Sequence, residues 1–133
     1  MKKSLNILQL QIISWNSGIL RACNSIPFSI ANKINSNGLA AEAALKAHNE
    51  FLTERTAALA AITDEDERAA ALLACEADAA GALYDVELSV FPVSAFESLD
   101  ISGEKDYPRQ DGSIIKLSYR EAFFHLVEFI VAE

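Results

Sequence analysis

The sequence predicts an α+β fold that is mainly helical, with a single domain over residues 1–133. About seventeen of the residues from 39 to 83 are alanine, which has the highest helix propensity. The pattern changes at Tyr84 to the alternation that is typical of strands. Apolar residues recur at helical spacing in three segments, namely 7–23, 27–83 and 119–131. We therefore expect a long antiparallel Ala-rich helical hairpin packed with N- and C-terminal helices, plus a small β element near 84–117.

The first helix is expected over residues 7–23. Its apolar residues recur every three or four positions, so they share one side of the helix, and we expect this side to face the core. The members of this stripe are Leu8, Ile12, Trp15, Ile19 and Cys23. The run from Leu8 to Ile12 also alternates, so a strand at this place is the competing interpretation.

The second helix is expected to begin at Pro27, because a proline suits the first turn, where its missing N–H has no helical partner. Its apolar stripe continues through Ile30, Ile34, Ala41, Leu45, His48 and Leu52. The turn-forming residues Asn35 to Gly38 interrupt this stripe, which leaves either one helix that extends to about residue 62 or two helices. The stripe keeps its phase across Gly38, and this favours one long helix.

The other half of the hairpin is expected after Thr63, whose side chain can cap it together with Asp66. The first turn holds four consecutive acidic residues, which the helix dipole favours. These residues are Asp64, Glu65, Asp66 and Glu67. We expect Arg68 to pair with Asp64. Because the connection at 62–63 is short, the two helices are expected to run antiparallel and, with alanines between them, to pack closely.

The segment after the hairpin is expected to hold short strands. Val86, Leu88 and Val90 alternate with polar residues, which predicts a half-buried strand. Three further pieces are expected to follow, namely one helical turn over 94–99, a polar loop over 103–112 and a second short strand over 113–117.

The last helix is expected over residues 119–131, because Ser118 and Glu121 form a capping box before it. Its apolar residues cover most of the circumference, so we expect it to be largely buried. The remaining polar stripe holds Glu121, His125 and Glu128 on one face. One imidazole and two carboxylates are possible metal ligands, but the solvent-facing stripe of a buried helix explains the same spacing, and no metal site is predicted.

The charge of the chain restricts its partners. The net charge is −8, and such a field repels phosphate backbones, so no nucleic-acid partner is expected. Residues 1–38 carry four basic groups and no acidic ones, whereas residues 39–112 carry nearly all the acid. These opposite charges could attract each other within a subunit, between copies, or toward a basic partner. Plain solubility is the simpler explanation of the excess acid.

The N-terminal residues resemble a secretory signal, since two lysines precede an apolar run. Polar residues such as Asn6 and Gln9 interrupt the run, and Arg21 stands where a cleavage site needs a small residue, so we expect no signal. No run is long enough to span a membrane, and no membrane partner is expected. Cys23 and Cys75 are too few and too far apart for a disulfide framework, which favours a reducing cytoplasmic location.

No catalytic site and no cofactor are predicted. The five glycines are far apart, so no loop can cradle a phosphate. The chain has two histidines and no nucleophile elbow. His48 falls on the inner stripe of the long helix, where a packing role explains it better than a buried base. The acidic run 64–67 lacks the glycine and the final acid that a calcium loop requires.

The order of the parts resembles a group of small uncharacterised phage and prophage proteins. The resemblance rests on Ile26–Ile34 opening a long helix, on the acidic-tipped hairpin, and on Val86–Leu88, Phe96–Ile101 and the capped helix at Ser118. Relative to that pattern, residues 103–117 look like an insertion. The resemblance implies no catalytic residues.

The leading hypothesis is therefore a non-enzymatic phage-type accessory or structural protein that acts by binding another protein, in the host cell cytoplasm if it is phage-encoded. The expected contact residues are Asp64, Glu65, Asp66 and Glu67. The partner could be a second copy, because a thin hairpin leaves apolar surface to cover. An acidic inhibitor of a basic, nucleic-acid-handling host protein is the first alternative, and a metal-dependent enzyme centred on His125 is the second.

Overall fold

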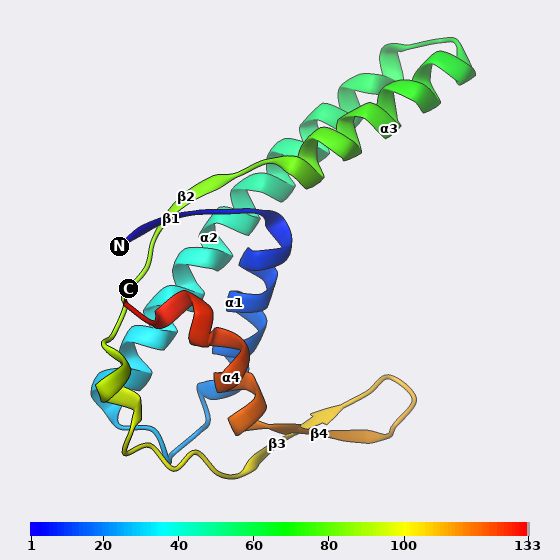
Figure 1. Cartoon of the computed structure of the whole chain (residues 1–133). Helices are drawn as coiled ribbons and strands as arrows, with labels where there is room; N and C mark the ends of the chain where they lie inside the picture. Colours follow the sequence, from blue (N-terminus) through cyan, green and yellow to red (C-terminus); the bar gives the residue numbers. More distant parts are fainter. Residues whose placement is uncertain (133) are drawn as a thin grey trace.

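The computed structural model describes residues 1–132 of the chain. In this range the fold is α+β and mainly helical, as predicted. Its helices are α1 (Ile7–Leu20), α2 (Phe28–Ala58), α3 (Glu65–Gly81) and α4 (Tyr119–Ile130). Two parts can be distinguished in Figure 1. The body comprises residues 1–48 and 83–132, and the arm, residues 49–82, extends away from it.

The core of the molecule lies in the body. There α1 packs against the first part of α2 and against α4. The largest fully buried side chains come from these helices and from the segment after the first sheet, and they are Leu10, Ile13, Ile34, Leu88, Leu126 and Ile130. The residues that resemble a secretory signal therefore contribute to the core. Within the described chain, no helix combines the length and apolarity that a membrane span would require.

The predicted helix over 7–23 is present as α1, but the prediction of its buried face was only partly correct, since Ile19 and Cys23 are buried as expected and Leu8 and Trp15 are not. Leu8 and Trp15 are 65% and 51% exposed, whereas the buried positions include Leu10, Asn16 and Ser17. Asn16 can be buried because its side-chain amide donates to the backbone carbonyl of Ile12, which lies one helical turn earlier, at 2.8 Å. Asn16 and Ser17 thus occupy the inner face. Because both are polar, apolar residues at helical spacing do not identify this face as the buried one.

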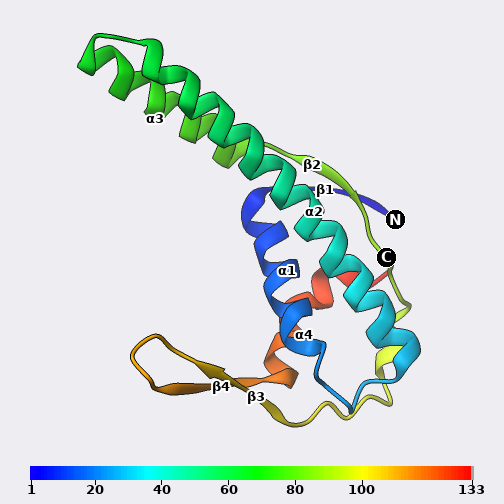
Figure 2. The same ribbon diagram turned by 180° about the vertical axis from the view of Figure 1, so that it is seen from behind.

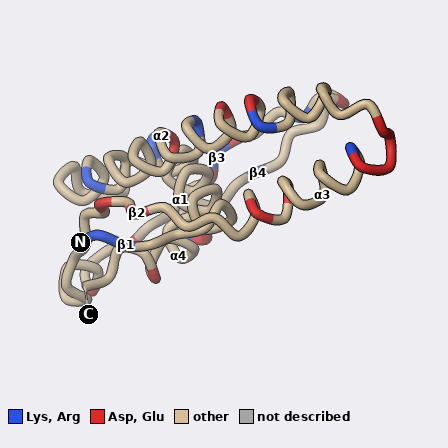
Figure 3. Tube along the Cα trace, turned by 90° about the horizontal axis from the view of Figure 1, so that it is seen from above, with Lys and Arg blue, Asp and Glu red and all other residues tan. Residues whose placement is uncertain are grey.

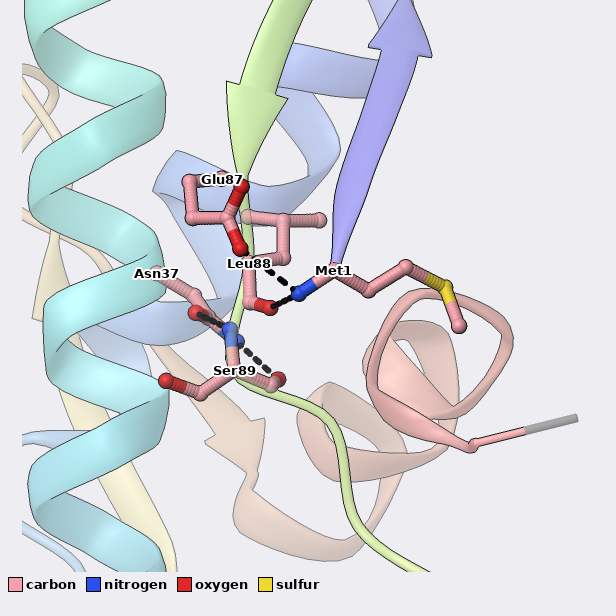
Figure 4. A network of polar contacts seen from close by, with 5 residues as sticks. All are labelled: Met1, Asn37, Glu87, Leu88 and Ser89. Atoms are coloured by element: carbon pink, nitrogen blue, oxygen red, sulfur yellow. Dashed lines mark hydrogen bonds and ion pairs between the residues drawn. The ribbon is translucent and has the colours of Figure 1, made fainter.

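The long second helix is one helix, α2, followed by a short 3₁₀ turn over Leu59–Ala61. The residues that suggested a break serve packing instead. A β-carbon on Gly38 would lie 2.6 Å from the β-carbon of Ser17, so only glycine lets α2 approach α1 this closely. The Asn37 side chain donates to Ser89 O at 3.0 Å and accepts from Ser89 N at 2.7 Å, which fastens α2 to the segment that follows β2 (Figure 4).

The arm consists of the second part of α2 and of α3, which runs back beside it in the opposite direction (Figures 1 and 2). The predicted cap at Thr63 was wrong, because Asp64 is the N-cap of α3. Its carboxylate accepts from the backbone N–H groups of Asp66 and Glu67 at 2.9 and 3.0 Å. Aspartate is an effective N-cap, and a cap one residue later leaves Thr63 in the connection.

Two small antiparallel sheets complete the described chain. Strand β1 (Lys2–Leu5) pairs with β2 (Tyr84–Glu87), with Lys2 opposite Glu87. Strand β3 (Glu104–Pro108) pairs with β4 (Ile114–Ser118) and projects from the body. The predicted strands near 86–90 and 113–117 correspond to β2 and β4, although Val90 lies beyond β2. Strand β1 was not predicted, and β3 occupies half of the segment expected to be a polar loop.

The C-terminal part follows the sequence pattern closely. The predicted turn over 94–99 is a 3₁₀ helix at Val93–Phe96. Helix α4 begins after Ser118, whose hydroxyl accepts from the backbone N–H of Glu121 at 3.3 Å. Its inner side is buried as expected, through Tyr119, Ala122, Phe123, Leu126, Phe129 and Ile130. Phe91 and Val131 form a parallel bridge that ties the end of α4 to the segment after β2.

Candidate protein-binding arm

The arm differs from the body in that none of its residues, 49–82, is buried. The half-buried residues of its two helices recur at spacings of three and four, so they share one side of each helix. On α2 these include Leu52 and Thr56, and on α3 they include Ala71, Cys75 and Ala79. These sides face each other, and everything else on the arm is open to solvent.

The outward side of α3 is apolar. Ala70, Leu73, Ala77 and Ala80 recur at spacings of three and four and are all exposed. Leu73 is 68% exposed and lies at the centre of this set, which we call the outer stripe. Such an uninterrupted apolar stripe along an exposed helix is typical of surfaces that another protein covers.

A second exposed apolar group lies on the α2 side of the arm. Phe51 is 57% exposed, and the guanidinium carbon of Arg55 stands 5.5 Å from the centre of its ring. A guanidinium group over an aromatic face is a favourable arrangement that interfaces often use. Phe51 and Leu73 did not stand out in the sequence, because helical periodicity alone does not say which apolar residues lack a neighbour.

The predicted acidic contact residues lie together at the tip of the arm, where α2 ends and α3 begins (Figure 3). All four are exposed. The predicted pairing of Arg68 with Asp64 was wrong, since the Arg68 guanidinium donates to the backbone carbonyl of Ile62 at 3.3 Å. None of the ion pairs found within residues 1–132 includes a residue of 64–67. The negative charge at the tip is therefore uncompensated by ion pairs in the described chain.

At the base of the arm, His48 hydrogen-bonds to Tyr84. The distance from His48 Nδ1 to the Tyr84 hydroxyl is 2.6 Å, and the two rings are nearly perpendicular with centres 5.5 Å apart. His48 is buried, in agreement with its place on the inner stripe of α2. Tyr84 was not singled out in the sequence. This pair joins α2 to the first residue of β2 at the end of the body from which the arm extends.

The weak metal candidates are not arranged as ligands. Glu121, His125 and Glu128 are exposed on the outer side of α4. No three or more histidine, cysteine, aspartate or glutamate side chains in the described residues are grouped so that they could hold a metal ion. Lys3 Nζ donates to the backbone carbonyl of Glu128 at 3.2 Å, a contact that does not involve the Glu128 carboxylate.

Part of the basic N-terminal segment is paired within the chain. The α-amino group of Met1 donates to Glu87 Oε1 at 2.9 Å and to Leu88 O at 2.8 Å (Figure 4). The same amino group lowers the pKa of Glu87 from its ordinary value, first through the hydrogen bond and then through its charge. Arg21 also pairs with Glu42 at 3.2 Å.

Comparison of the chain with protein-family models, with curated proteins and with solved structures finds no match.

Proposed function

We propose that this chain is a non-enzymatic accessory or structural protein of the phage type, and that it works by binding another protein through the arm. In this proposal α2 and α3 form an antiparallel hairpin whose alanines let the two helices approach closely. The observation that carries the proposal is the absence of any buried residue from 49 to 82. Helices are normally stabilised by burying their apolar sides, and here the outer stripe of α3 is left open to a partner.

Two features of the arm suit protein binding. The outer stripe offers an apolar contact about 15 Å long, as estimated from a rise of about 1.5 Å per residue. The acidic tip, residues 64–67, can steer a partner with a basic surface and orient it along the arm. The tip would then control the rate and the salt dependence of association, while the stripe would control how long the complex lasts.

In the alternative, in which the chain is an acidic inhibitor, the affinity for the partner depends entirely on charge. This alternative differs from docking through the arm in one respect that can be measured. An inhibitor of a basic groove depends on residues 64–67 and loses most of its affinity in high salt, because screening weakens contacts between exposed charges. Docking through the outer stripe depends on Leu73 and persists in high salt.

The decisive experiment is chemical crosslinking in cells that naturally encode the chain, with three variants compared. Leu73→Glu places a charge in the outer stripe, and we expect it to reduce the recovery of the specific partner by about tenfold or more. Leu8→Glu is the matched control, because Leu8 on α1 is 65% exposed and lies outside the arm. Reversal of Glu65, Asp66 and Glu67 to lysine tests the tip and leaves the Asp64 cap of α3 in place.

Equal recovery of the same partner with Leu73→Glu and with Leu8→Glu would contradict the proposal. Recovery that falls only with the reversed tip would favour the inhibitor. Mass spectrometry of the crosslinked product shows whether the partner is a different protein or a second copy of this chain. Light scattering at high concentration gives an independent measure of self-association.

A further inference from the structure

The hairpin of β3 and β4 stands apart from the helices. It projects from the body as a sheet of two strands that pairs with no other strand of residues 1–132 (Figures 1 and 2). A hairpin of two strands is at best marginally stable in water, and a sheet becomes independently stable with three strands or more. The hairpin lies outside the arm, so an inference about it stands independently of the proposed function.

The backbone bond at the tip of the hairpin shows which groups of β4 are free. Arg109 N donates to Ser113 O at 2.8 Å, and these two residues continue the register of the sheet. In an antiparallel pair, opposite residues alternate between those that exchange hydrogen bonds and those that do not. Odd-numbered residues therefore bond across the hairpin. Ile114 and Lys116 instead direct their N–H and C=O groups away from β3.

The two edges of the hairpin differ in their protection against strand pairing. The residues of β3 that point outward are Glu104, Asp106 and Pro108, and charged residues and proline are what proteins use to block an edge. On β4 the outward residue Ile114 is apolar and 62% exposed. The Lys116 ammonium lies 3.2 Å from Asp106 Oδ1, so it is held toward β3. The edge of β4 is therefore the unprotected one.

The charges beside β4 restrict the side chains of an added strand. A hollow at the base of the hairpin is lined in part by Lys116, Ser118 and Arg120, with Glu104 on the β3 side. Arg120 forms no ion pair with any residue of 1–132. A strand beside β4 has the whole of β4 between itself and Glu104, so the charges that it meets first are basic. An acidic side chain on the added strand is therefore favoured.

A second copy of this chain suits the edge of β4 poorly. If two copies of β4 paired with full overlap about a two-fold axis, Lys116 would stand opposite its own copy, and like charges in that position are unfavourable. The strand has five residues and is about 17 Å long, whereas a stable dimer buries at least about 1,200 Å². An extended segment of another protein needs no such area, because strand addition commonly binds short peptides.

We infer that β4 is a docking edge for an extended segment of another protein, which adds to the hairpin as a third strand. Its backbone would bond to the free N–H and C=O groups of Ile114 and Lys116. Its apolar side chains would lie beside Ile115 and Leu117 on the half-buried face of the sheet. On the other face, an acidic side chain would lie beside Lys116 and Arg120.

The test is an NMR titration of the isotopically labelled full chain with a blocked peptide of threonine, valine, glutamate, valine and threonine. We expect the amide resonances of Ile114 and Lys116 to shift and saturate, with a dissociation constant of about 1 mM. N-methylation of the glutamate, whose N–H faces β4 when it lies opposite Lys116, should weaken binding about tenfold or more. N-methylation of a valine, whose N–H faces away, is the matched control and should leave binding within about threefold.

Two substitutions show where the peptide binds. Ile114→Pro removes an outward N–H at the first residue of β4 and should weaken binding about tenfold, whereas Glu104→Pro makes the same change on β3 and should leave it within about twofold. If Ile114→Pro disrupts the hairpin, Arg120→Glu at an exposed position of α4 should reverse the preference to a peptide with lysine in place of glutamate.

Three results would overturn the inference. The first is equal binding of the two N-methylated peptides, and the second is a set of shifts that stay linear with peptide concentration or lie outside the hairpin. The third is a dimer in light scattering that Ile114→Pro dissociates, because a second copy of the chain would then occupy the edge.

Discussion

One helix, α2, passes through both the body and the arm, and its two halves are held in different ways. In the body Ile30, Ile34 and Ala41 are buried against α1 and the elements around it. In the arm no residue of α2 or α3 is buried, although the helices continue without interruption. The difference shows that alanine-rich sequence can keep a helix formed where packing contributes little. The arm should therefore open locally at lower free energy than the body.

The largest expected effect is on the free energy of unfolding. One pair of leucine substitutions, one in the body and one in the arm, shows the difference between the two halves. Leu126 on α4 is almost fully buried, and Leu126→Ala should lower the free energy of unfolding by about 2–5 kcal/mol through the cavity that it leaves. Leu73→Ala on the arm should change it by less than about 0.5 kcal/mol. Urea unfolding followed by circular dichroism measures both, and similar losses at the two sites would mean that the arm has a core of its own.

A pair of glycine substitutions sharpens the same contrast. Gly38→Ala forces a β-carbon against Ser17, and we expect a loss of about 1–3 kcal/mol from overpacking between α1 and α2. Gly81→Ala has open space, since nothing lies within 4 Å of the added carbon, and should stabilise α3 by up to about 1 kcal/mol. Thermal unfolding of both variants is the measurement. An unchanged free energy of unfolding in Gly38→Ala would show that α1 and α2 can move slightly apart without loss of stability.

The cap of α3 provides a smaller effect that is confined to the arm. Asp64→Ala removes the acceptor for two backbone N–H groups and should destabilise α3 by about 1 kcal/mol. Amide hydrogen exchange should show faster exchange in α3 while α1 and α4 stay unchanged. Asp64→Ser retains a capping oxygen and is the matched control. Faster exchange throughout the body would contradict the independence of the arm.

The smallest effect concerns the ion pair between Met1 and Glu87. The amino group lowers the pKa of Glu87 in the folded state, so the pair stabilises the fold above the unfolded-state pKa. That contribution is lost as the pH falls through the folded-state pKa. Acetylation of the amino group should return the pKa of Glu87 toward its ordinary value, as measured by NMR titration. An unchanged titration would show that the contact is absent in solution.

The sequence was informative about the helices and much less so about their surroundings. Helical spacing and alanine content placed α1, α2, α3 and α4 to within a few residues, because local propensity and periodicity decide where a helix forms. Strand β1 could not be found in this way. It is four residues long, and its partner β2 lies about eighty residues later in the chain, so no local pattern marks the pairing.

The inner face of α1 shows why the packing was harder to predict than the helix. Two stripes of apolar residues compete on this helix, one through Leu8 and Trp15 and one through Leu10 and Ile13. The choice depends on Ser17, which must be small so that Gly38 can approach. In the candidate site, the acidic tip was predicted from composition alone. The exposure of Leu73 and the contact of His48 with Tyr84 depend on tertiary structure, which periodicity does not contain.

The continuity of α2 makes the molecule a lever. Its 31 residues span about 45 Å at about 1.5 Å per residue. A rotation of α2 by about 5° about Gly38 would therefore move its far end, which lies about 30 Å from Gly38, by roughly 3 Å. Asn37 and Gly38 act as the pivot, because Asn37 bonds to Ser89 in the segment after β2 and Gly38 packs directly against α1. A force applied to the tip of the arm would therefore act first on the contact between α1 and α2.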